Sequence, residues 1–360
     1  MDWLTPATKM PWPVTVPFRM GPNLQKLDPV APALLLRDEL SGVYRREREL
    51  VIAAHPERAM VGNADDETLS AILGLAPSPA ARERAGVRAT FGTRQDDSAS
   101  HQTAHPSPVL QTASAQACAD RSGGGSQAIR NPASTPQGAR EQNVALAIQE
   151  DFVILKQHQH TLRTEYLSVC FPSRWDPREK LGLDFAAIHA PVADNPMLLA
   201  AGPNIMTMAF VKQPMLRYVW LIVPAANLDQ HPEKNQVWWS EALADPSPLL
   251  PRLFLRIERQ TTWPLPHLQR AVFFIRLMMS PLTEVLRISA PIRRERISAP
   301  VRPERLSATV RPERSEGSDV PVTRAAELAA ALRSMTPAVV AYRGMTHALQ
   351  RLLTELDTFE

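Results

Sequence analysis

The chain contains little cysteine and little excess charge, and each shortage excludes a class of protein. Only two cysteines, Cys118 and Cys170, occur in 360 residues, which argues against a disulfide framework and against a cysteine-rich zinc or iron–sulfur site. The formal net charge is only +3, so bulk electrostatics give no reason to expect nucleic acid or a membrane surface as a partner. Apolar residues at 44% and charged residues at 21% are typical of a globular protein.

Long hydrophobic runs and the common catalytic motifs are also missing. The most apolar run, around Tyr218 to Ala226, is interrupted by Pro224 and is too short to span a membrane. The first residues lack the basic start and unbroken apolar run of a signal peptide, so we expect a protein of the reducing cytoplasm. The sequence has no HExxH, CxxC, Walker, GxGxxG or GxSxG motif, so zinc hydrolysis, phosphate-loop, dinucleotide and serine-elbow chemistry are unsupported.

Proline is abundant instead, with 34 residues against 14 glycines, and two stretches stand out as low in complexity. Residues 78–140 are rich in Ser, Ala, Gln, Pro and Gly without a sustained period, which predicts a disordered insertion. Residues 287–320 begin with a nine-residue repeat, RISAPIRRE, RISAPVRPE, RLSATVRPE. We interpret this repeat as a second disordered insertion. A basic patch for nucleic acid is the alternative, disfavoured because Arg and Glu alternate along it.

The two insertions leave three ordered parts. Residues 1–77 form an N-terminal helical part, residues 141–286 an α+β core, and residues 321–360 C-terminal helices. Apolar spacing predicts helices at Leu34–Ala54, from Asp65 or Asp66 to Leu75, over Val144–Gln157, and twice within Thr323–Phe359, with a turn near Met335 to Pro337 and a possible break at Gly344.

Strands are predicted mainly in the second half of the core. A short β-branched and aromatic stretch, Leu167 to Phe171, is the first of them. The runs Leu216–Val223 and Leu253–Thr261 follow, and Ala271–Met279 is expected to pair antiparallel with the second of these. Cys170 lies in an apolar stretch, where a small core residue is more common than a thiolate ligand.

The segment WDPREKLGLDFAAIHAPV, Trp175 to Val192, combines a proline-opened helical stretch with an isolated histidine. His189 ends this stretch and is followed at once by Pro191, which cannot continue a helix. An imidazole at such a place suits a single axial ligand for a haem iron, the common metal cofactor that needs only one protein side chain. A buried structural histidine fits the same pattern.

Three charged residues, Arg256, Glu258 and Arg259, lie close together on the predicted strand Leu253–Thr261. Alternation places Arg256 and Glu258 on one face, and Arg259 on the other face with Leu255 and Ile257. Arginine can clamp carboxylates, including haem propionates, and Glu258 can accept a hydrogen bond from a cationic amine or relay protons. A cross-strand salt-bridge ladder would give the same pattern.

Several blocks, in this order, resemble the haem-dependent oxidative N-demethylase family. They are PFRMG (17–21) with LDP soon after, VALAIQEDFVIL (144–155), CFPSRW, EKLG and IHAPV (170–192), RYVW (217–220), LRIERQT with LP (255–266) and AYRGM (341–345). The resemblance covers most of the chain outside the two insertions. One difference is Val219, where the family usually has asparagine.

The resemblance implies an α+β fold with a PAS-like antiparallel sheet, flanking helices and helical extensions at both ends. It implies haem-dependent oxidative removal of a methyl group from a small amine, releasing formaldehyde. Electrons would come from NADPH through a separate reductase subunit carrying flavin and an iron–sulfur cluster, and a tetrahydrofolate-dependent partner would accept the formaldehyde. A haem-PAS sensor or an inactive paralogue is the alternative.

The same resemblance assigns expected roles to individual residues. His189, the histidine of IHAPV, is the expected iron ligand. Arg259, Arg217 and Trp220 are expected to contact the cofactor. Glu258 and Arg256 are the expected catalytic pair.

Overall fold

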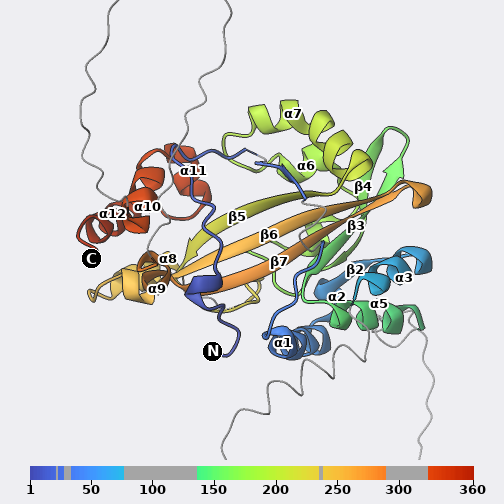
Figure 1. Cartoon of the computed structure of the whole chain (residues 1–360), viewed down its shortest axis with the longest axis horizontal. Helices are drawn as coiled ribbons and strands as arrows, with labels where there is room; N and C mark the ends of the chain where they lie inside the picture. The colour runs from blue at the N-terminus through green and yellow to red at the C-terminus, as the bar shows by residue number, and fades with distance from the viewer. Residues whose placement is uncertain (22, 28–33, 77–135, 235–237, 289–322) are drawn as a thin grey trace, which may run out of the picture.

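The computed structural model describes residues 1–21, 23–27, 34–76, 136–234, 238–288 and 323–360. These residues build one seven-stranded sheet in the order β1-β5-β6-β7-β3-β4-β2, with every neighbouring pair antiparallel (Figure 1). The strands are β1 Gln25–Lys26, β2 Met60–Gly62, β3 Asp151–His158, β4 Thr161–Ser168, β5 Met215–Val223, β6 Phe254–Leu265 and β7 Arg270–Pro281. The α+β class with an antiparallel sheet is therefore confirmed, and the PAS-like topology stays a prediction.

Three long strands form the middle of the sheet. β6 pairs with β7 from Phe254 opposite Pro281 to Leu265 opposite Arg270, and β5 lies along the other edge of β6. All three strands were predicted, and the antiparallel pairing of β6 with β7 is confirmed. β6 is longer than expected, and the face that carries Arg256 and Glu258 is buried like the apolar face, with 0% and 9% exposure.

Helices cover both faces of the sheet and one of its ends (Figure 1). One face is covered by α1 Ser41–Ala54, α2 Pro56–Ala59, α3 Asp66–Leu75 and α5 Pro136–Ala147. The opposite face is covered by α6 Phe185–His189 and α7 Pro196–Thr207, followed by the π-helical turn η4 Met208–Lys212. At the end of β5–β7 lie α8 Trp239–Ala244, α9 Leu282–Leu286, α10 Arg324–Arg333, α11 Pro337–Tyr342 and α12 Leu349–Asp357.

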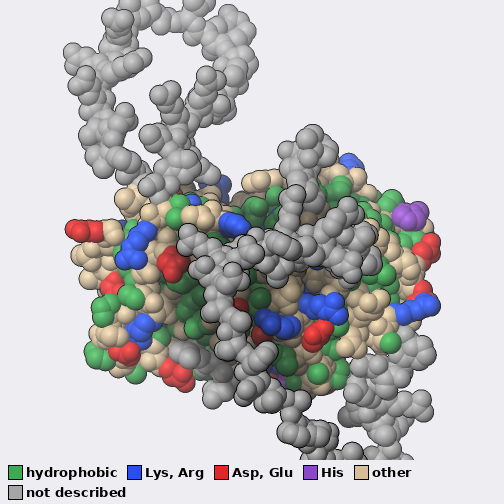
Figure 2. Space-filling model, turned by 60° about the horizontal axis from the view of Figure 1, so that its bottom comes forward, with side chains coloured by type: hydrophobic (Ala, Val, Ile, Leu, Met, Phe, Trp, Pro, Cys, Tyr) green, Lys and Arg blue, Asp and Glu red, His purple; other side chains and the backbone are tan. Residues whose placement is uncertain are grey.

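Hydrophobic packing explains these three layers. Under α1, α3 and α5, a cluster that includes Tyr44, Ile72, Phe152 and Phe274 is fully buried. The C-terminal helices pack their leucines on the end of the same face of β5–β7, around Ile257. Such burial is the main stabilising contribution to a fold of this kind. Figure 2 brings the α1 side forward and shows acidic and basic side chains interspersed on it, as the small net charge implies.

Several boundaries differ from the expectations. α1 begins at Ser41 rather than Leu34, because side chains bind the backbone before it: Glu150 accepts from the N–H of Leu36, and Gln149 from that of Asp38. α3 begins after Asp65, which accepts from the N–H of Thr68, so the predicted cap is confirmed. The predicted helix over Val144–Gln157 is wrong beyond Ala147, since β3 begins at Asp151.

The remaining differences concern the insertions and the C-terminal part. α5 begins at Pro136, so residues 136–140 are helical although they were expected in the first insertion. The rest of that insertion and the repeat from residue 289 lie outside the described residues. The C-terminal part has three helices instead of two, and its break at Gly344, φ +71°, is confirmed. Among the described residues no helix is long and apolar enough to cross a membrane.

Candidate functional site

The segment that carries His189 consists of two short helices rather than one. The first is η3, Pro177–Lys180, and the second is α6. Gly182 separates them with a φ of +76°, a conformation that favours glycine. Asp184 caps α6 by accepting a hydrogen bond from the N–H of Ala187 at 3.0 Å. His189 is thus the last residue of a capped helix, as the sequence indicated.

The ring of His189 is held in one orientation. Its Nδ1 lies 2.7 Å from the carbonyl oxygen of Phe185, and the two rings pack with centroids 4.1 Å apart. Because a carbonyl only accepts, Nδ1 carries the proton and the lone pair is on Nε2. Burial lowers the pKa of His189, and the charges of Arg217 and Lys180 lower it further. The ring is therefore a neutral imidazole whose Nε2 carries the lone pair.

Arg217 enters this site from β5. It lies opposite Gln260 of β6, and Val219 lies opposite Glu258, so these four residues share one face of the sheet. Figure 1 shows α6 and α7 over that face. Burial lowers the pKa of Arg217, and the negative charge of Glu258 opposes the shift. Its Nε is buried and has no hydrogen-bond partner within the part of the chain that the structure describes. His189, Arg217 and Glu258 are thus brought together.

Both oxygens of the Glu258 carboxyl group are held by neighbours. The Oγ of Ser173 donates to Oε1, and the Nε2 of Gln260 donates to Oε2 at 2.8 Å. Two donors on a carboxyl group that is 9% exposed fix its position on the sheet face. Glu258 is therefore a preorganised acceptor beside Arg217.

Arg256 lies next to this carboxyl group and is fully buried. Its Nε donates to Ser173, Nη1 to the carbonyl of Asn227 at 3.1 Å, and Nη2 to the carbonyl of Phe171 at 2.9 Å. Burial lowers its pKa to about 10, and the charge of Glu258 works against this. All three guanidinium nitrogens are engaged in joining two loops to β6.

The structure does not bring Arg259 and Trp220 to the same place. Both project from the opposite face of the sheet, since Trp220 pairs with Ile257 and Arg259 alternates with Glu258. Arg259 donates from Nη1 to the carbonyl of Leu34 at 3.2 Å. The Trp220 ring packs edge-on against Phe18, with centroids 5.7 Å apart.

Three further residues border the site, and the sequence reasoning did not single them out. Arg174 has a φ of +67°, a pKa lowered by burial, and an Nε without a hydrogen-bond partner among the described residues. A Cβ on Gly344 would lie 3.2 Å from Nη1 of Arg174. Partial burial of the half-exposed Tyr342 ring raises its pKa, and the negative charge of Glu258 raises it further. These residues belong to the CFPSRW and AYRGM blocks. Their place in blocks that resemble the family is the sequence feature that could have identified them.

One comparison with known protein families gives a match for the part of the chain that carries this site. Residues 129–298 match the model of a family described as haem-dependent oxidative N-demethylase, alpha subunit-like. The match includes β3–β7 and α6, and with them His189, Arg217, Arg256 and Glu258. No curated protein is similar enough to match the chain. This match, over residues 129–298, supports membership of the chain in the haem-dependent oxidative N-demethylase, alpha subunit-like family.

Proposed function

We propose that this protein is a haem-dependent monooxygenase of the cytoplasm that removes a methyl group from a small methylated amine and releases formaldehyde. The carrying observation is the orientation of His189, whose Nδ1 proton is bound to Phe185 and whose Nε2 is left for a metal. The same hydrogen bond orients many metal-binding histidines. The proposal includes a PAS-like haem domain, with His189 as the iron ligand.

The donor set on this face of the sheet fits a haem. His189 would hold the iron through one neutral nitrogen, Nε2, as a histidine does in many haem proteins. Arg217 and Arg174 each have a buried Nε without a partner among the described residues, and such groups are stabilised by the carboxylates of haem propionates. When bound, the haem supplies the dioxygen activation and the oxidation of the methyl C–H bond.

Glu258 is proposed to bind the substrate amine. A protonated secondary amine carries a positive charge, and a fixed carboxylate recognises it better than water does. Each oxygen of Glu258 receives one hydrogen bond in the structure and keeps a lone pair for an ammonium N–H. Val219, where the family usually has asparagine, lies directly opposite Glu258, so the difference concerns the surroundings of the proposed amine site.

Arg256 is proposed as a positioning residue, although the sequence suggested a catalytic one. Its guanidinium nitrogens donate to Ser173 and to three backbone carbonyls, those of Asn227, Phe171 and Pro172, so it would act on the substrate only through Ser173 and Glu258. Arg259 and Trp220 lie on the other face, where they would hold β5 and β6 in place.

The proposed activity needs partners. The family description contains the words alpha subunit-like, which supports a multi-subunit enzyme. We propose that NADPH delivers electrons through a separate flavin and iron–sulfur reductase, and that a tetrahydrofolate-dependent component captures the formaldehyde. The alternative function is a haem-PAS sensor, which would use the same histidine without productive electron delivery.

The experiment is an assay of formaldehyde release by the haem-loaded full chain, with dimethylamine, NADPH and such a reductase. Glu258→Gln should lower kcat/KM roughly 10- to 100-fold, the equivalent of one charge-assisted hydrogen bond. Glu233→Gln is the matched control, because Glu233 is an exposed carboxylate paired with Arg178. If NADPH is consumed but formaldehyde release does not depend on the amine, the proposed demethylase activity is contradicted and the haem-PAS sensor remains as the alternative function.

A further inference from the structure

The helix that carries His189 packs against the next helix in the chain. α6 and α7 lie side by side over the same face of the sheet (Figure 1). Phe185 of α6 contacts His189 in two ways: its carbonyl oxygen lies 2.7 Å from Nδ1, and its ring packs on the imidazole with centroids 4.1 Å apart. Whatever fixes the position of Phe185 therefore also fixes the imidazole.

Gly202 of α7 is the residue that the Phe185 ring contacts on the neighbouring helix. Gly202 is buried, and a Cβ added to it would lie 3.0 Å from Cδ1 and 3.2 Å from Cε1 of Phe185. Carbon atoms in contact pack about 3.5–4.0 Å apart, so the ring occupies the space that a side chain on Gly202 would need. Among the described residues outside α7, the atoms within 4 Å of such a Cβ all belong to Phe185.

The backbone gives no other reason for a glycine at this place. Gly202 lies inside α7, its φ is not positive, and Pro203 follows it directly. Glycine in a helix interior is less favourable than alanine, and a proline beside it weakens the same turn. Close packing against the Phe185 ring is the structural feature that requires the missing side chain.

Both ends of α6 are tied to neighbouring elements. Asp184, which precedes α6, forms an isolated β-bridge with Arg163 of β4. Asn195, at the start of α7, donates from Nδ2 to the carbonyl oxygens of His189 at 3.1 Å and of Ala190 at 2.8 Å. Because α6 is held at both ends, an extra methyl group on α7 would displace the aromatic ring within α6 rather than move the whole helix.

We infer that Gly202 is a positioning residue for His189: by leaving room for the Phe185 ring, it keeps Nδ1 bound to the Phe185 carbonyl and the lone pair on Nε2. The inference rests on the proposed function, in which this Nε2 binds iron. A neutral imidazole carries one proton, and the hydrogen bond made by one ring nitrogen selects the tautomer. If the bond to Phe185 is lost, the proton can move to Nε2, and a protonated Nε2 has no lone pair for a metal.

The tautomer of His189 in the haem-free full chain tests this inference. In protein labelled with nitrogen-15 at histidine, NMR spectra at pH 8 distinguish protonated from unprotonated ring nitrogens, and His189→Ala identifies the signals of His189. The parent should carry the proton on Nδ1. Gly202→Ala should raise the ratio of the Nε2–H to the Nδ1–H form roughly 2- to 10-fold, the effect of losing one neutral hydrogen bond. A parent with its proton on Nε2, or an unchanged ratio in Gly202→Ala, would overturn the inference.

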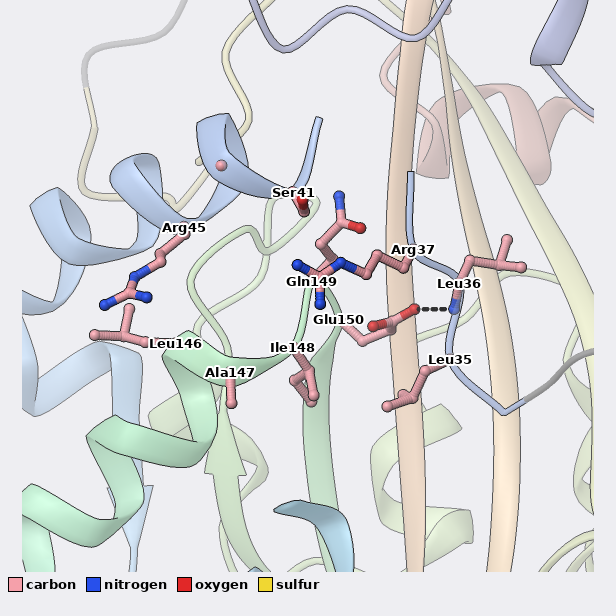
Figure 3. A pocket seen from close by; sticks show the side chains of 11 residues that line it. Leu35, Leu36, Arg37, Ser41, Arg45, Leu146, Ala147, Ile148, Gln149 and Glu150 are labelled. Carbon is pink, nitrogen blue, oxygen red and sulfur yellow. Dashed lines mark hydrogen bonds between the residues drawn. The ribbon is translucent and has the colours of Figure 1, made fainter. Parts of the chain in front are cut away.

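Two further variants show whether the effect passes through the Phe185 ring. Gly42→Ala is the matched control: Gly42 lies in α1 on the other side of the sheet, where it lines a small pocket with Ser41 and Arg45 (Figure 3), and a Cβ there would meet nothing within 4 Å. It should keep the parent ratio. In a Phe185→Ala background, Gly202→Ala should have no further effect, because the ring that it displaces is gone. A full effect without the ring would contradict this route.

The haem-loaded chain gives a second readout. A hydrogen bond on Nδ1 makes the imidazole a stronger ligand, so the iron–histidine stretching frequency of the ferrous protein, measured by resonance Raman spectroscopy, should fall in Gly202→Ala. It should stay unchanged in Gly42→Ala. The same frequency in all three proteins would contradict the inference. If the parent binds no haem but its tautomer ratio responds to Gly202→Ala, the proposed function is contradicted and the positioning of the imidazole by Gly202 stands.

Discussion

The Nε of Arg256 lies 2.8 Å from the Oγ of Ser173, across 83 residues of sequence. A guanidinium only donates, so the Ser173 oxygen is the acceptor of this bond and its own proton is left for Glu258. The direction of both hydrogen bonds is thus fixed by the chemistry of arginine. The Ser173 hydroxyl group therefore links the guanidinium group of Arg256 to the carboxyl group of Glu258.

Replacing Ser173 by alanine should destabilise the protein by about 1–3 kcal/mol, because a buried Nε of Arg256 and an oxygen of Glu258 lose their partner. Urea unfolding followed by circular dichroism measures the change. Ser70→Ala is the matched control: Ser70 is exposed on α3 and binds only the carbonyl of Asp66. The control should stay within about 0.5 kcal/mol of the parent protein. Equal losses of stability in Ser173→Ala and Ser70→Ala would argue against this role of the Ser173 hydroxyl group.

Gly62 in β2 is predicted to accept no side chain. Its φ is +92°, and a Cβ would lie 2.3 Å from the carbonyl oxygen of Glu165. Gly62→Ala should lower the free energy of unfolding by about 2 kcal/mol or more, from strain and displaced backbone together. Gly74→Ala in α3, where a Cβ meets nothing within 4 Å, should raise stability by about 0.5–1 kcal/mol. If Gly62→Ala leaves the free energy of unfolding unchanged, the backbone of Gly62 cannot lie this close to the carbonyl oxygen of Glu165.

The buried ion pair of Arg48 and Asp151 is predicted to be essential for folding. The Nη1 of Arg48 lies 2.8 Å from Oδ1 of Asp151, and both side chains are almost fully buried. Asp151→Ala should cost about 3–5 kcal/mol, because the arginine remains buried without its counter-charge. Glu49→Ala breaks the exposed pair with Arg45 and should cost less than about 1 kcal/mol. Thermal unfolding of both variants would distinguish the two cases, and similar melting temperatures would disprove the prediction.

Cys170 is predicted to be unreactive in the folded state. Burial raises the pKa of its thiol from 9.0 to about 12, so no thiolate forms at pH 8 to 9. Iodoacetamide should modify Cys170 only after unfolding, as peptide mapping by mass spectrometry can measure. Rapid labelling of the native protein at this position would contradict the burial.

The raised pKa of the Cys170 thiol also determines how the stability of the protein changes with pH. Above about pH 9 the unfolded state loses a thiol proton that the folded state keeps, so this group makes the protein less stable as pH rises towards 12. A Cys170→Ala variant lacks this contribution, and its stability should fall less steeply over that pH range. Parallel pH profiles for parent and variant would show that the thiol ionises equally in both states.

The sequence predicted the long strands β5, β6 and β7 but failed at β3. β3 has Phe152 and Ile154 against one layer of helices and Val153 and Leu155 against the other, so its apolar run does not alternate. A short continuous apolar run of this kind resembles a buried helix, which is why the sequence pattern predicts a helix over Val144–Gln157. β6 alternates more clearly, and its faces were assigned correctly.

The site was predictable only in part, for a related reason. Alternation fixed that Arg256 and Glu258 share a face, and a proline after His189 fixed the end of its helix. The partners of these groups come from distant segments, as Ser173 does for Glu258. Pairing of residues more than 80 positions apart depends on the tertiary fold, so local sequence patterns do not reveal it.

The central claim is that Nε2 of His189 is the iron ligand, and a haem titration of the full chain followed by absorbance tests it most directly. The parent protein should develop a Soret band that saturates at one haem per chain. His160→Ala, at an exposed histidine, should behave like the parent. His189→Ala should lose the band or bind haem at least tenfold more weakly, and added imidazole should restore the parent spectrum. An unchanged spectrum and affinity in His189→Ala would contradict the account.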